Sequence, residues 1–373
     1  MSQRRDIQVM MDELQQTSHV IKENLATFLD GLKSNNAIFE SDVRKIYAVG
    51  CGDSLFAAMA VKEAFIKTSG IEFVAVEAME FCRYEVENIP EGSVVFVISY
   101  SGSVARTAEC ATAARQHGAK VVALTGNPQG RLAKLADHVL LYKVESLGFA
   151  PGTISFTAAL MSLYLIAIKF GQYPQRAPKI NADEALKALN DIVQLTTDTI
   201  LSLKDDAYRI AEKFKNQKLF YVIGAGPNLG IAHFGAAKLI EGGELDAIPQ
   251  QLEEWAHLQY FTSTPEKVTL VICPEGRAIS RARELISEMN FIDTRSILIT
   301  SGKGKQLNAE DELCIPGNID EIYTPLLTSV VLGLIAFYIS YANGKSSYNF
   351  KSQEEEEEHY ATLHDSEFYQ WEH

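Results

Sequence analysis

The stretch that decides the fold occurs twice, as Tyr47-Ala-Val-Gly-Cys-Gly52 and as Tyr221-Val-Ile-Gly-Ala-Gly226. Each copy is a short apolar strand that runs into a Gly-x-Gly turn, and a stretch with helical spacing follows. The two copies lie 174 positions apart (221 − 47), and residues 93–98 and 267–272 form a second strand match at the same offset (267 − 93). Two matches at one offset indicate two copies of one α/β unit.

Apolar strands alternate with helical stretches along each copy. In the first copy we expect strands at 45–50, 73–76, 93–99 and 120–125, and helices at 54–67 and 105–116. This alternation is typical of a parallel sheet that helices cover on both faces. The expected fold class is therefore α/β, with two tandem, doubly wound (flavodoxin-like) parallel sheets.

Four ranges organise the chain. Residues 1–38 form a helical leader, 39–175 the first copy, 176–345 the second copy and 346–373 an acidic tail. The boundary between the copies falls in the Pro/Gly-rich stretch 171–178. The five glutamates at 354–358 are typical of a solvated helix face or a tail.

Composition excludes several classes of function. The chain has 373 residues and a net charge of 34 − 48 = −14, which argues against nucleic acid and against an anionic membrane as partners. Its five cysteines are scattered and form no C-x-x-C pair, so no disulfide framework or structural zinc site is expected. The start of the chain lacks the apolar segment of a signal peptide, and the apolar run 325–341 is interpreted as a buried helix. We expect a soluble, cytoplasmic protein.

The first copy carries a turn that is suited to an anion. Residues 99–103 read Ser-Tyr-Ser-Gly-Ser between a strand and a helix, so backbone N–H groups and hydroxyls would point outward there. The second copy has Glu275 at the matching place, which would repel an anion. The alternative is that Ser99 and Ser101 only cap the helix and end the strand. A dinucleotide is not expected, because neither Gly-x-Gly turn has the third glycine at the fingerprint spacing.

These motifs carry a resemblance. The order strand–GCGDS–helix, strand–SYSGS–helix and then a second copy resembles the tandem sugar isomerase (SIS) domain family over residues 40–345. Within it, the chain is similar to the isomerase half of glucosamine-6-phosphate synthase and to the fructosamine-6-phosphate deglycases. The resemblance implies that the anionic end of a sugar is bound by the substrate-binding residues Gly52, Asp53, Ser54, Ser99, Tyr100, Ser101, Gly102 and Thr107.

The resemblance also implies the catalytic residues. Glu241 and His257 fill the two family positions 16 residues apart (257 − 241), and Lys238 lies one helical turn before Glu241. Glu241 would move a proton between C1 and C2 through an enediol, and His257 would open the sugar ring. This chemistry needs no metal and no cofactor. In the synthase the neighbouring subunit supplies the histidine, which implies a homodimer with shared sites.

Departures from the family pattern leave the substrate open. Val104 replaces a threonine of the anion turn, so the anion is either a phosphate held differently or another group such as a sulfonate. Amino transfer is not expected, since the chain begins Met1-Ser2 and the synthase's tail is absent. The leading hypothesis is an aldose–ketose isomerase of a 6-phosphorylated or similarly anionic hexose. The alternatives are a fructosamine-6-phosphate deglycase, which shares the fold and site, and a sugar-phosphate sensor. His359, Tyr360 and His364 in the tail could fold over a site.

Overall fold

The computed structural model describes residues 5–33, 35–39, 42–302, 307–345, 348 and 350–368. The chain forms two units, each assembled from separate stretches of sequence. The first-sheet unit consists of Glu23–Val144, Ala158–Leu186 and Phe350–His373, and the second-sheet unit of Met1–Lys22, Glu145–Thr157 and Lys187–Asn349. The units therefore interleave along the chain, whereas the four ranges expected from the sequence are consecutive.

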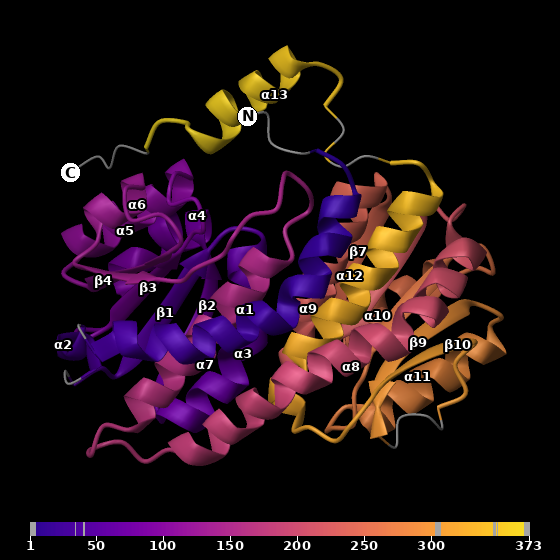
Figure 1. The fold of residues 1–373 in the computed structure, drawn as a ribbon, viewed down its shortest axis with the longest axis horizontal. Coiled ribbons are helices and arrows are strands. Elements are labelled where there is room, and N and C mark those ends of the chain that lie inside the picture. The colour runs from indigo at the N-terminus through magenta and orange to yellow at the C-terminus, as the bar shows by residue number, and fades with distance from the viewer. Residues whose placement is uncertain are drawn as a thin grey trace. The chain divides into compact units, whose positions relative to one another are not determined.

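The first-sheet unit is built on a parallel sheet with strand order β2-β1-β3-β4-β5. Its strands are β1 (Lys45–Gly50), β2 (Glu72–Glu77), β3 (Val94–Ile98), β4 (Lys120–Thr125) and β5 (His138–Leu141). Its helices are α2 (Asn36–Phe39), α3 (Asp53–Ser69), α4 (Ala78–Glu80), α5 (Ala105–Gln116) and α6 (Arg131–Leu135). The central strand β3 is buried along its whole length, as expected for a strand with helices on both faces (Figure 1).

The two faces of this sheet have different cores. On one face, Val95 and Val97 pack against α5 at Cys110 and Ala114. On the other face, aromatic rings meet: the ring of Phe170 lies 4.7 Å from Phe39 and 6.4 Å from Phe96. Phe170 belongs to α7 (Ile154–Gly171), and the rings around it join three separate elements.

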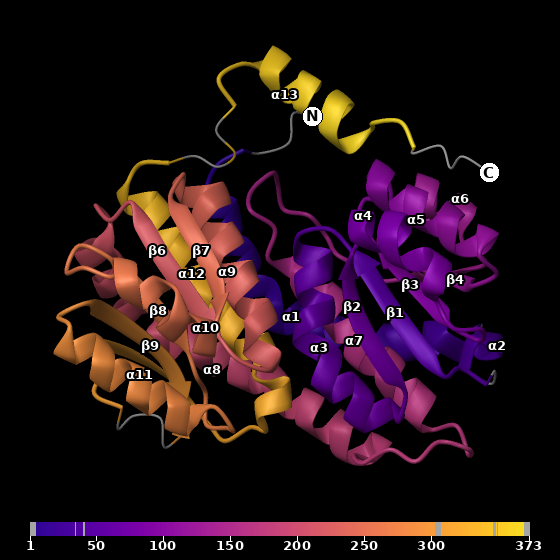
Figure 2. The same ribbon diagram turned by 180° about the vertical axis from the view of Figure 1, so that it is seen from behind.

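The second-sheet unit has a parallel sheet of the same strand order, written from the other edge as β10-β9-β8-β6-β7. Its strands are β6 (Leu219–Gly224), β7 (Asp246–Gln251), β8 (Val268–Ile272), β9 (Arg295–Ser301) and β10 (Asp311–Ile315). Its helices include α9 (Pro227–Gly243), α10 (Leu252–His257), α11 (Ile279–Phe291) and α12 (Pro325–Ala342). Helices α9 and α12 lie side by side (Figure 2), where a Cβ on Gly235 would come within 2.6 Å of Leu332.

The remaining helices connect or extend these units. They are α1 (Gln8–Lys33), α8 (Ala182–Phe214) and α13 (Gln353–His359), with short helices η1 (Phe81–Glu85), η2 (Val86–Asn88), η3 (Gln259–Thr262), η5 (Glu321–Tyr323) and η6 (Tyr360–His364). Two helices, α7 and α12, are long and apolar enough to span a membrane, but 83% of each span is buried inside the protein. The apolar run 325–341 is thus a core helix, as predicted.

The two parallel sheets confirm the predicted α/β fold class. The Gly-x-Gly turns that follow β1 and β6 also have nearly the same backbone angles. Gly52 has φ 52° and ψ −129°, and Gly226 has φ 55° and ψ −127°, a left-handed conformation that L side chains rarely adopt. The predicted ranges of β1, α5 and β4 agree with the structure. The edge strands β5, β7 and β10 were not predicted, because β5 has only 4 residues and polar residues interrupt the apolar ones in β7 and β10.

The aromatic face of the first sheet gives a stability prediction. Replacing buried Phe170 by alanine removes contacts to three elements and should cost about 3–5 kcal/mol of unfolding free energy in urea titrations. The matched control is Tyr84→Ala on η1, whose ring is exposed and should cost less than about 0.5 kcal/mol. Equal losses in the two variants would contradict this packing.

Candidate active site

The first Gly-x-Gly turn lies at the carboxyl end of β1. A Cβ on Gly50 would come within 2.7 Å of the Ser54 Cβ, so the chain can enter α3 here only with glycine. Asp53 and Ser54 begin α3, and the N-cap residue of this helix is Gly52, which has no side chain to cap it. Burial and the neighbouring Glu77 raise the pKa of the Cys51 thiol to about 12, so this thiol stays protonated near neutral pH.

The serine turn, residues 99–103, lies at the carboxyl end of the adjacent strand β3. Ser99 is buried, and its hydroxyl accepts a hydrogen bond from the Gly102 N–H at 3.2 Å. Ser101 and Ser103 are exposed, with their hydroxyl oxygens 2.9 Å apart. Gly102 has φ 63°, which lets the chain turn sharply into α5. The turn thus presents two hydroxyls at the start of a helix, an arrangement suited to an anion.

Residues after β4 brace the serine turn, and the sequence analysis missed them. The Asn127 side-chain amide donates to the Ser101 carbonyl at 3.0 Å. The Leu132 N–H donates to the Gly102 carbonyl at 2.9 Å, and this bond fixes the start of α6 directly against the turn. A third segment of the first sheet therefore holds the shape of the turn.

Thr125, the last residue of β4, links this third segment to the serine turn. Its hydroxyl donates to the Tyr100 carbonyl at 3.2 Å and accepts from the Asn127 N–H, also at 3.2 Å. A polar residue at the end of a buried strand, or just after it, is the sequence signal that could have identified this segment.

Two more of the predicted binding residues have side-chain hydroxyls that donate hydrogen bonds to backbone carbonyls of the protein itself. Thr107 is buried, and its hydroxyl donates to the Val104 carbonyl at 2.7 Å inside the first turn of α5. The Tyr100 hydroxyl donates to the Val144 carbonyl at 3.3 Å, and its ring lies 6.0 Å from that of Tyr142. Burial raises the pKa of Tyr142, and the charges of Tyr100 and Asp53 add to this rise. Of the serine and threonine residues in the predicted set, only Ser101 is exposed among the described residues, and its hydroxyl oxygen accepts from the Ser103 N–H at 3.3 Å.

The C-terminal segment docks on two arginines that flank the serine turn. Arg106 on α5 donates to the Ser366 hydroxyl at 3.0 Å, and Arg131 on α6 lies 3.4 Å from the Asp365 carboxylate. The Arg131 guanidinium also lies 4.1 Å from the centre of the Phe368 ring. Residues 365–368 are therefore the part of the tail that reaches this edge of the sheet. The rings of His359, Tyr360 and His364 lie against one another, tilted or edge to face, with centres 5.1–5.3 Å apart.

The second-sheet unit holds the predicted Lys238 and Glu241. They lie one turn apart on α9, with the Lys238 Nζ 2.8 Å from the Glu241 Oε2. The lysine side chain is only 1% exposed, whereas the Glu241 side chain is 30% exposed. The lysine ammonium also lies over the Phe234 ring, 5.1 Å from its centre. A buried cation next to a carboxylate favours the ionised form of that carboxylate.

His257 has a different partner. It ends α10, its side chain is 64% exposed, and its Nε2 lies 3.3 Å from the Glu253 carboxylate. Arg281 holds the same carboxylate at 2.6 Å, and this bond is the main cause that lowers the pKa of Glu253. The structure therefore brings Lys238 and Glu241 together, and places His257 in a separate, exposed ion pair.

The turn of the second-sheet unit that matches the serine turn is occupied by a carboxylate of the protein. Glu321 Oε2 accepts a hydrogen bond from the Arg277 N–H at 3.1 Å. Its oxygens lie where a Cβ on Gly276 would be, so glycine makes room for the carboxylate. Burial, together with the charge of Glu321, raises the pKa of Cys273 to about 12. In the serine turn the Gly102 and Ser103 N–H groups donate instead to the Ser99 and Ser101 hydroxyls, at 3.2 and 3.3 Å, so no carboxylate occupies that turn among the described residues.

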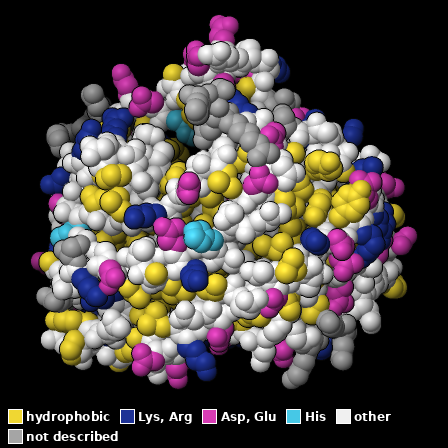
Figure 3. All heavy atoms as spheres, in the orientation of Figure 1, with side chains coloured by type: hydrophobic (Ala, Val, Ile, Leu, Met, Phe, Trp, Pro, Cys, Tyr) yellow, Lys and Arg dark blue, Asp and Glu magenta, His cyan; other side chains and the backbone are white. Residues whose placement is uncertain are grey.

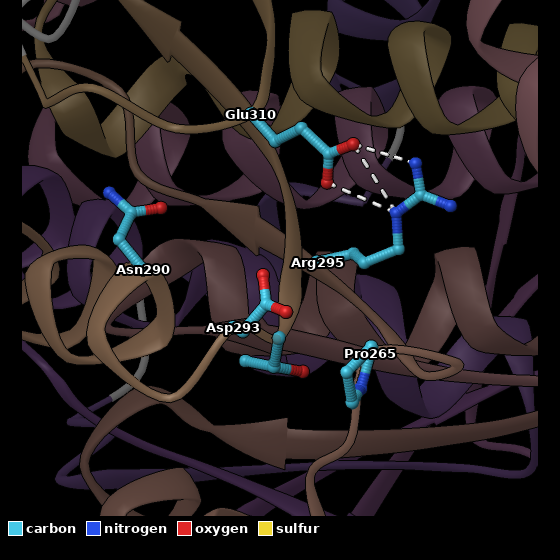
Figure 4. A pocket seen from close by; sticks show the side chains of 6 residues that line it. Pro265, Asn290, Asp293, Arg295 and Glu310 are labelled. Atoms are coloured by element: carbon cyan, nitrogen blue, oxygen red, sulfur yellow. Dashed lines mark hydrogen bonds and ion pairs between the residues drawn. The ribbon is translucent and has the colours of Figure 1, made fainter.

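A pocket of about 440 Å³ lies at the opposite edge of the second sheet, near the amino ends of β8 and β9. Figure 4 shows the Arg295 guanidinium turned toward Glu310, with Nη2 2.7 Å from the Glu310 Oε1. Because ligands of doubly wound sheets bind at the carboxyl ends of the strands, we assign no catalytic role to this pocket. Within the described residues, no three His, Cys, Asp or Glu side chains gather as metal ligands would.

Comparison with known proteins matches part of the chain to a domain family. Residues 41–169 match the model of the SIS domain. The isomerizing glutamine–fructose-6-phosphate aminotransferase of Gloeobacter violaceus is 25% identical over 342 residues, which cover 90% of this chain and 56% of that protein. The chain spans about half the length of the curated relatives it matches.

Solved structures share the fold. The C-terminal domain of glucosamine-fructose-6-phosphate aminotransferase from Francisella tularensis has a TM-score of 0.82 at 20% identity, covering 92% of this chain and 98% of that one. Tagatose-6-phosphate ketose/aldose isomerase from Escherichia coli has a TM-score of 0.76 at 17% identity, covering 91% of this chain and 94% of that one. Residues 41–169 are therefore a SIS domain, which confirms for this part of the chain the resemblance carried by its glycine and serine turns.

Proposed function

We propose that the chain is an aldose–ketose isomerase that acts on a hexose with an anionic group at C6, a phosphate or a similar group such as a sulfonate. The observation that carries the proposal is the ion pair between buried Lys238 and partly exposed Glu241. An isomerase needs one base that is ionised at rest and can reach the substrate. Glu241 fits this need, because its ion-pair partner Lys238 is buried whereas the Glu241 side chain is partly exposed to solvent.

The proposed reaction moves one proton between two carbons and one between two oxygens. The Glu241 carboxylate takes the proton from the carbon beside the carbonyl, the electron pair of that C–H bond forms the C=C bond, and the carbonyl oxygen takes up a proton from water to give an enediol. The same carboxyl group then returns its proton to the former carbonyl carbon, while the other hydroxyl of the enediol releases its proton to water and becomes the new carbonyl. The Lys238 ammonium is the ion-pair partner of the Glu241 carboxylate, 2.8 Å away.

The serine turn is the proposed site of the anionic group. Ser101 and Ser103 offer hydroxyls there, and α3 and α5 begin at the same edge of the sheet. Val104 forms no side-chain cap on α5, so the first N–H groups of that helix are left for the ligand. Hydroxyls and helix N-termini bind phosphate and sulfonate alike, and phosphate is the first choice on the family resemblance.

We infer that His257 opens the sugar ring in the site of a second copy of the chain. Its imidazole is exposed, as it must be to enter another subunit's site. The second-sheet unit also exposes Leu201, Tyr208 and Tyr341, and Figure 3 shows hydrophobic side chains gathered over α8 and α12. A groove of about 330 Å³ lies beside Tyr341, with Ile200 and Phe337 in its lining. Exposed apolar surface of this kind supports a homodimer.

The first prediction concerns the base. Replacing Glu241 by glutamine removes the proton acceptor and keeps the shape, so interconversion of the two sugars should fall at least about 1,000-fold while sugar binding persists. The matched control is Glu212→Gln, which removes the acid of another i, i+3 lysine–glutamate pair and should leave the rate unchanged. A Glu241→Gln enzyme that retains its rate would rule out this assignment.

A second prediction concerns the shared site. Glu241→Gln and His257→Asn homodimers should each be inactive, because each lacks one of the two groups in every site. When the two variants are co-expressed, half of the dimers are mixed and one of their two sites is intact, so about a quarter of the wild-type activity should return. Activity that stays absent, with mixed dimers present by mass spectrometry, would show that the sites are not shared.

A third prediction concerns the anion. Ser101→Ala removes an exposed hydroxyl that would bind a charged group, so inorganic phosphate should bind about 10–100-fold more weakly by calorimetry. Thr107→Val should leave phosphate binding unchanged, because the Thr107 hydroxyl is already bonded to Val104. The opposite ranking of the two variants would place the anion elsewhere.

A further inference from the structure

Two arginines flank the serine turn, although the chain carries a net charge of −14. Arg106 lies in the first turn of α5, and Arg131 is the first residue of α6. Gly130, just before Arg131, is packed so closely against the turn that a Cβ there would come within 3.0 Å of the Gly102 carbonyl oxygen. Both arginines therefore belong to helices that begin at the proposed anion site.

A buried carboxylate holds the Arg106 guanidinium. Glu109, one turn further along α5, has a side chain that is only 2% exposed, and it forms ion pairs with both Arg106 and Arg83. Arg83 lies on η1, with its Nε 3.0 Å from the Glu109 Oε1. A carboxylate this deep needs a cation beside it. Because two guanidiniums share one carboxylate, the group of three keeps a positive charge that an anion can neutralise.

The C-terminal segment covers both flanking guanidiniums with oxygen atoms. Arg106 donates to the Ser366 hydroxyl at 3.0 Å and to the Glu367 carbonyl. Arg131 pairs with the Asp365 carboxylate at 3.4 Å. Guanidiniums bind phosphate oxygens through the same N–H groups, so this segment and a phosphate would compete for the same donors.

The contacts that hold the segment are individually weak. The Asp365 side chain is 74% exposed and that of Arg131 is 43% exposed, and ion pairs at such exposed places contribute little to stability. The contact of Arg131 with the Phe368 ring is a cation–π interaction, which is also modest at an exposed site. The segment can therefore leave the two arginines while the sheet stays folded.

We propose that the C-terminal segment is an internal competitor of the sugar's anionic group: it occupies Arg106 and Arg131, and its release leaves the two guanidiniums free to bind the ligand. The inference rests on the proposed binding of the anion at the serine turn. With the segment docked, an anion meets engaged arginines and the additional negative charge of Asp365. With the segment released, it gains two cations beside the serine hydroxyls. The affinity for the anion is therefore set by the fraction of molecules in which the segment is released.

Two substitutions that break the same ion pair should have opposite effects. Asp365→Asn weakens the competitor, so inorganic phosphate should bind about 3–10-fold more tightly by calorimetry. Arg131→Gln also releases the segment but removes a cation that binds the anion, so phosphate should bind about 10-fold more weakly. Unchanged or weaker binding to Asp365→Asn, or tighter binding to Arg131→Gln, would overturn the proposal.

The matched control is Glu357→Gln on α13. It removes one negative charge from the same tail at a position that is bonded to Gln353, so the affinity for phosphate should stay that of the wild type. A gain in affinity equal to that of Asp365→Asn would assign the effect to the net charge of the tail and overturn the proposal.

A second readout follows the segment itself and does not depend on turnover. In protein labelled with 4-fluorophenylalanine, the ¹⁹F signal of Phe368 is assigned by its loss in Phe368→Leu. Saturating phosphate should move this signal towards its position in Arg131→Gln, where the segment is released. A signal that stays in place while phosphate binds would overturn the competition and leave the proposed function standing. Phosphate binding that Ser101→Ala does not weaken would instead overturn the proposed anion site.

Discussion

In a parallel sheet every strand ends at the same edge, and the helix that follows each strand begins there with unbonded N–H groups. Both sheets of this protein are parallel, so each has one edge at which a ligand-binding site can form. The turns after β1, β3 and β4 meet at one edge of the first sheet, and the last two are bonded to each other through Asn127 and Leu132. Residues far apart in the sequence thus lie together at one polar edge, because the strands that precede them are neighbours in one parallel sheet.

The two sheets use the same edge in opposite ways. In the first, Ser101 and Ser103 remain exposed at the start of α5. In the second, the Glu321 carboxylate accepts from the Arg277 N–H, so the corresponding position already holds a negative charge. The second unit contributes instead a buried ammonium and a carboxylate that meets solvent. In the proposed function, one copy of the fold binds the anion and the other holds the base.

The elements that could be predicted are those with a strong local pattern. The bounds of β1, α5 and β4 follow from apolar runs and helical spacing, and the pairing of Lys238 with Glu241 follows from their spacing on one helix. Three of the four edge strands were missed, because a strand such as 246–251, with a proline and two glutamines, has no apolar run. The burial of Glu13 was missed for another reason: its carboxylate accepts a hydrogen bond from Thr153, 140 positions away, and no local pattern encodes such a contact.

The central claim is that Glu241 moves a proton between two carbons of an anionic sugar. Proton NMR in D₂O tests it most directly, with the enzyme mixed in turn with glucose 6-phosphate, fructose 6-phosphate, fructosyl-amine 6-phosphate and a 6-sulfonated hexose. The account predicts that one aldose–ketose pair interconverts and gains deuterium at C2, without release of an amine. Free amine from the fructosyl-amine substrate, or saturable binding of a sugar with no exchange at any carbon, would contradict it.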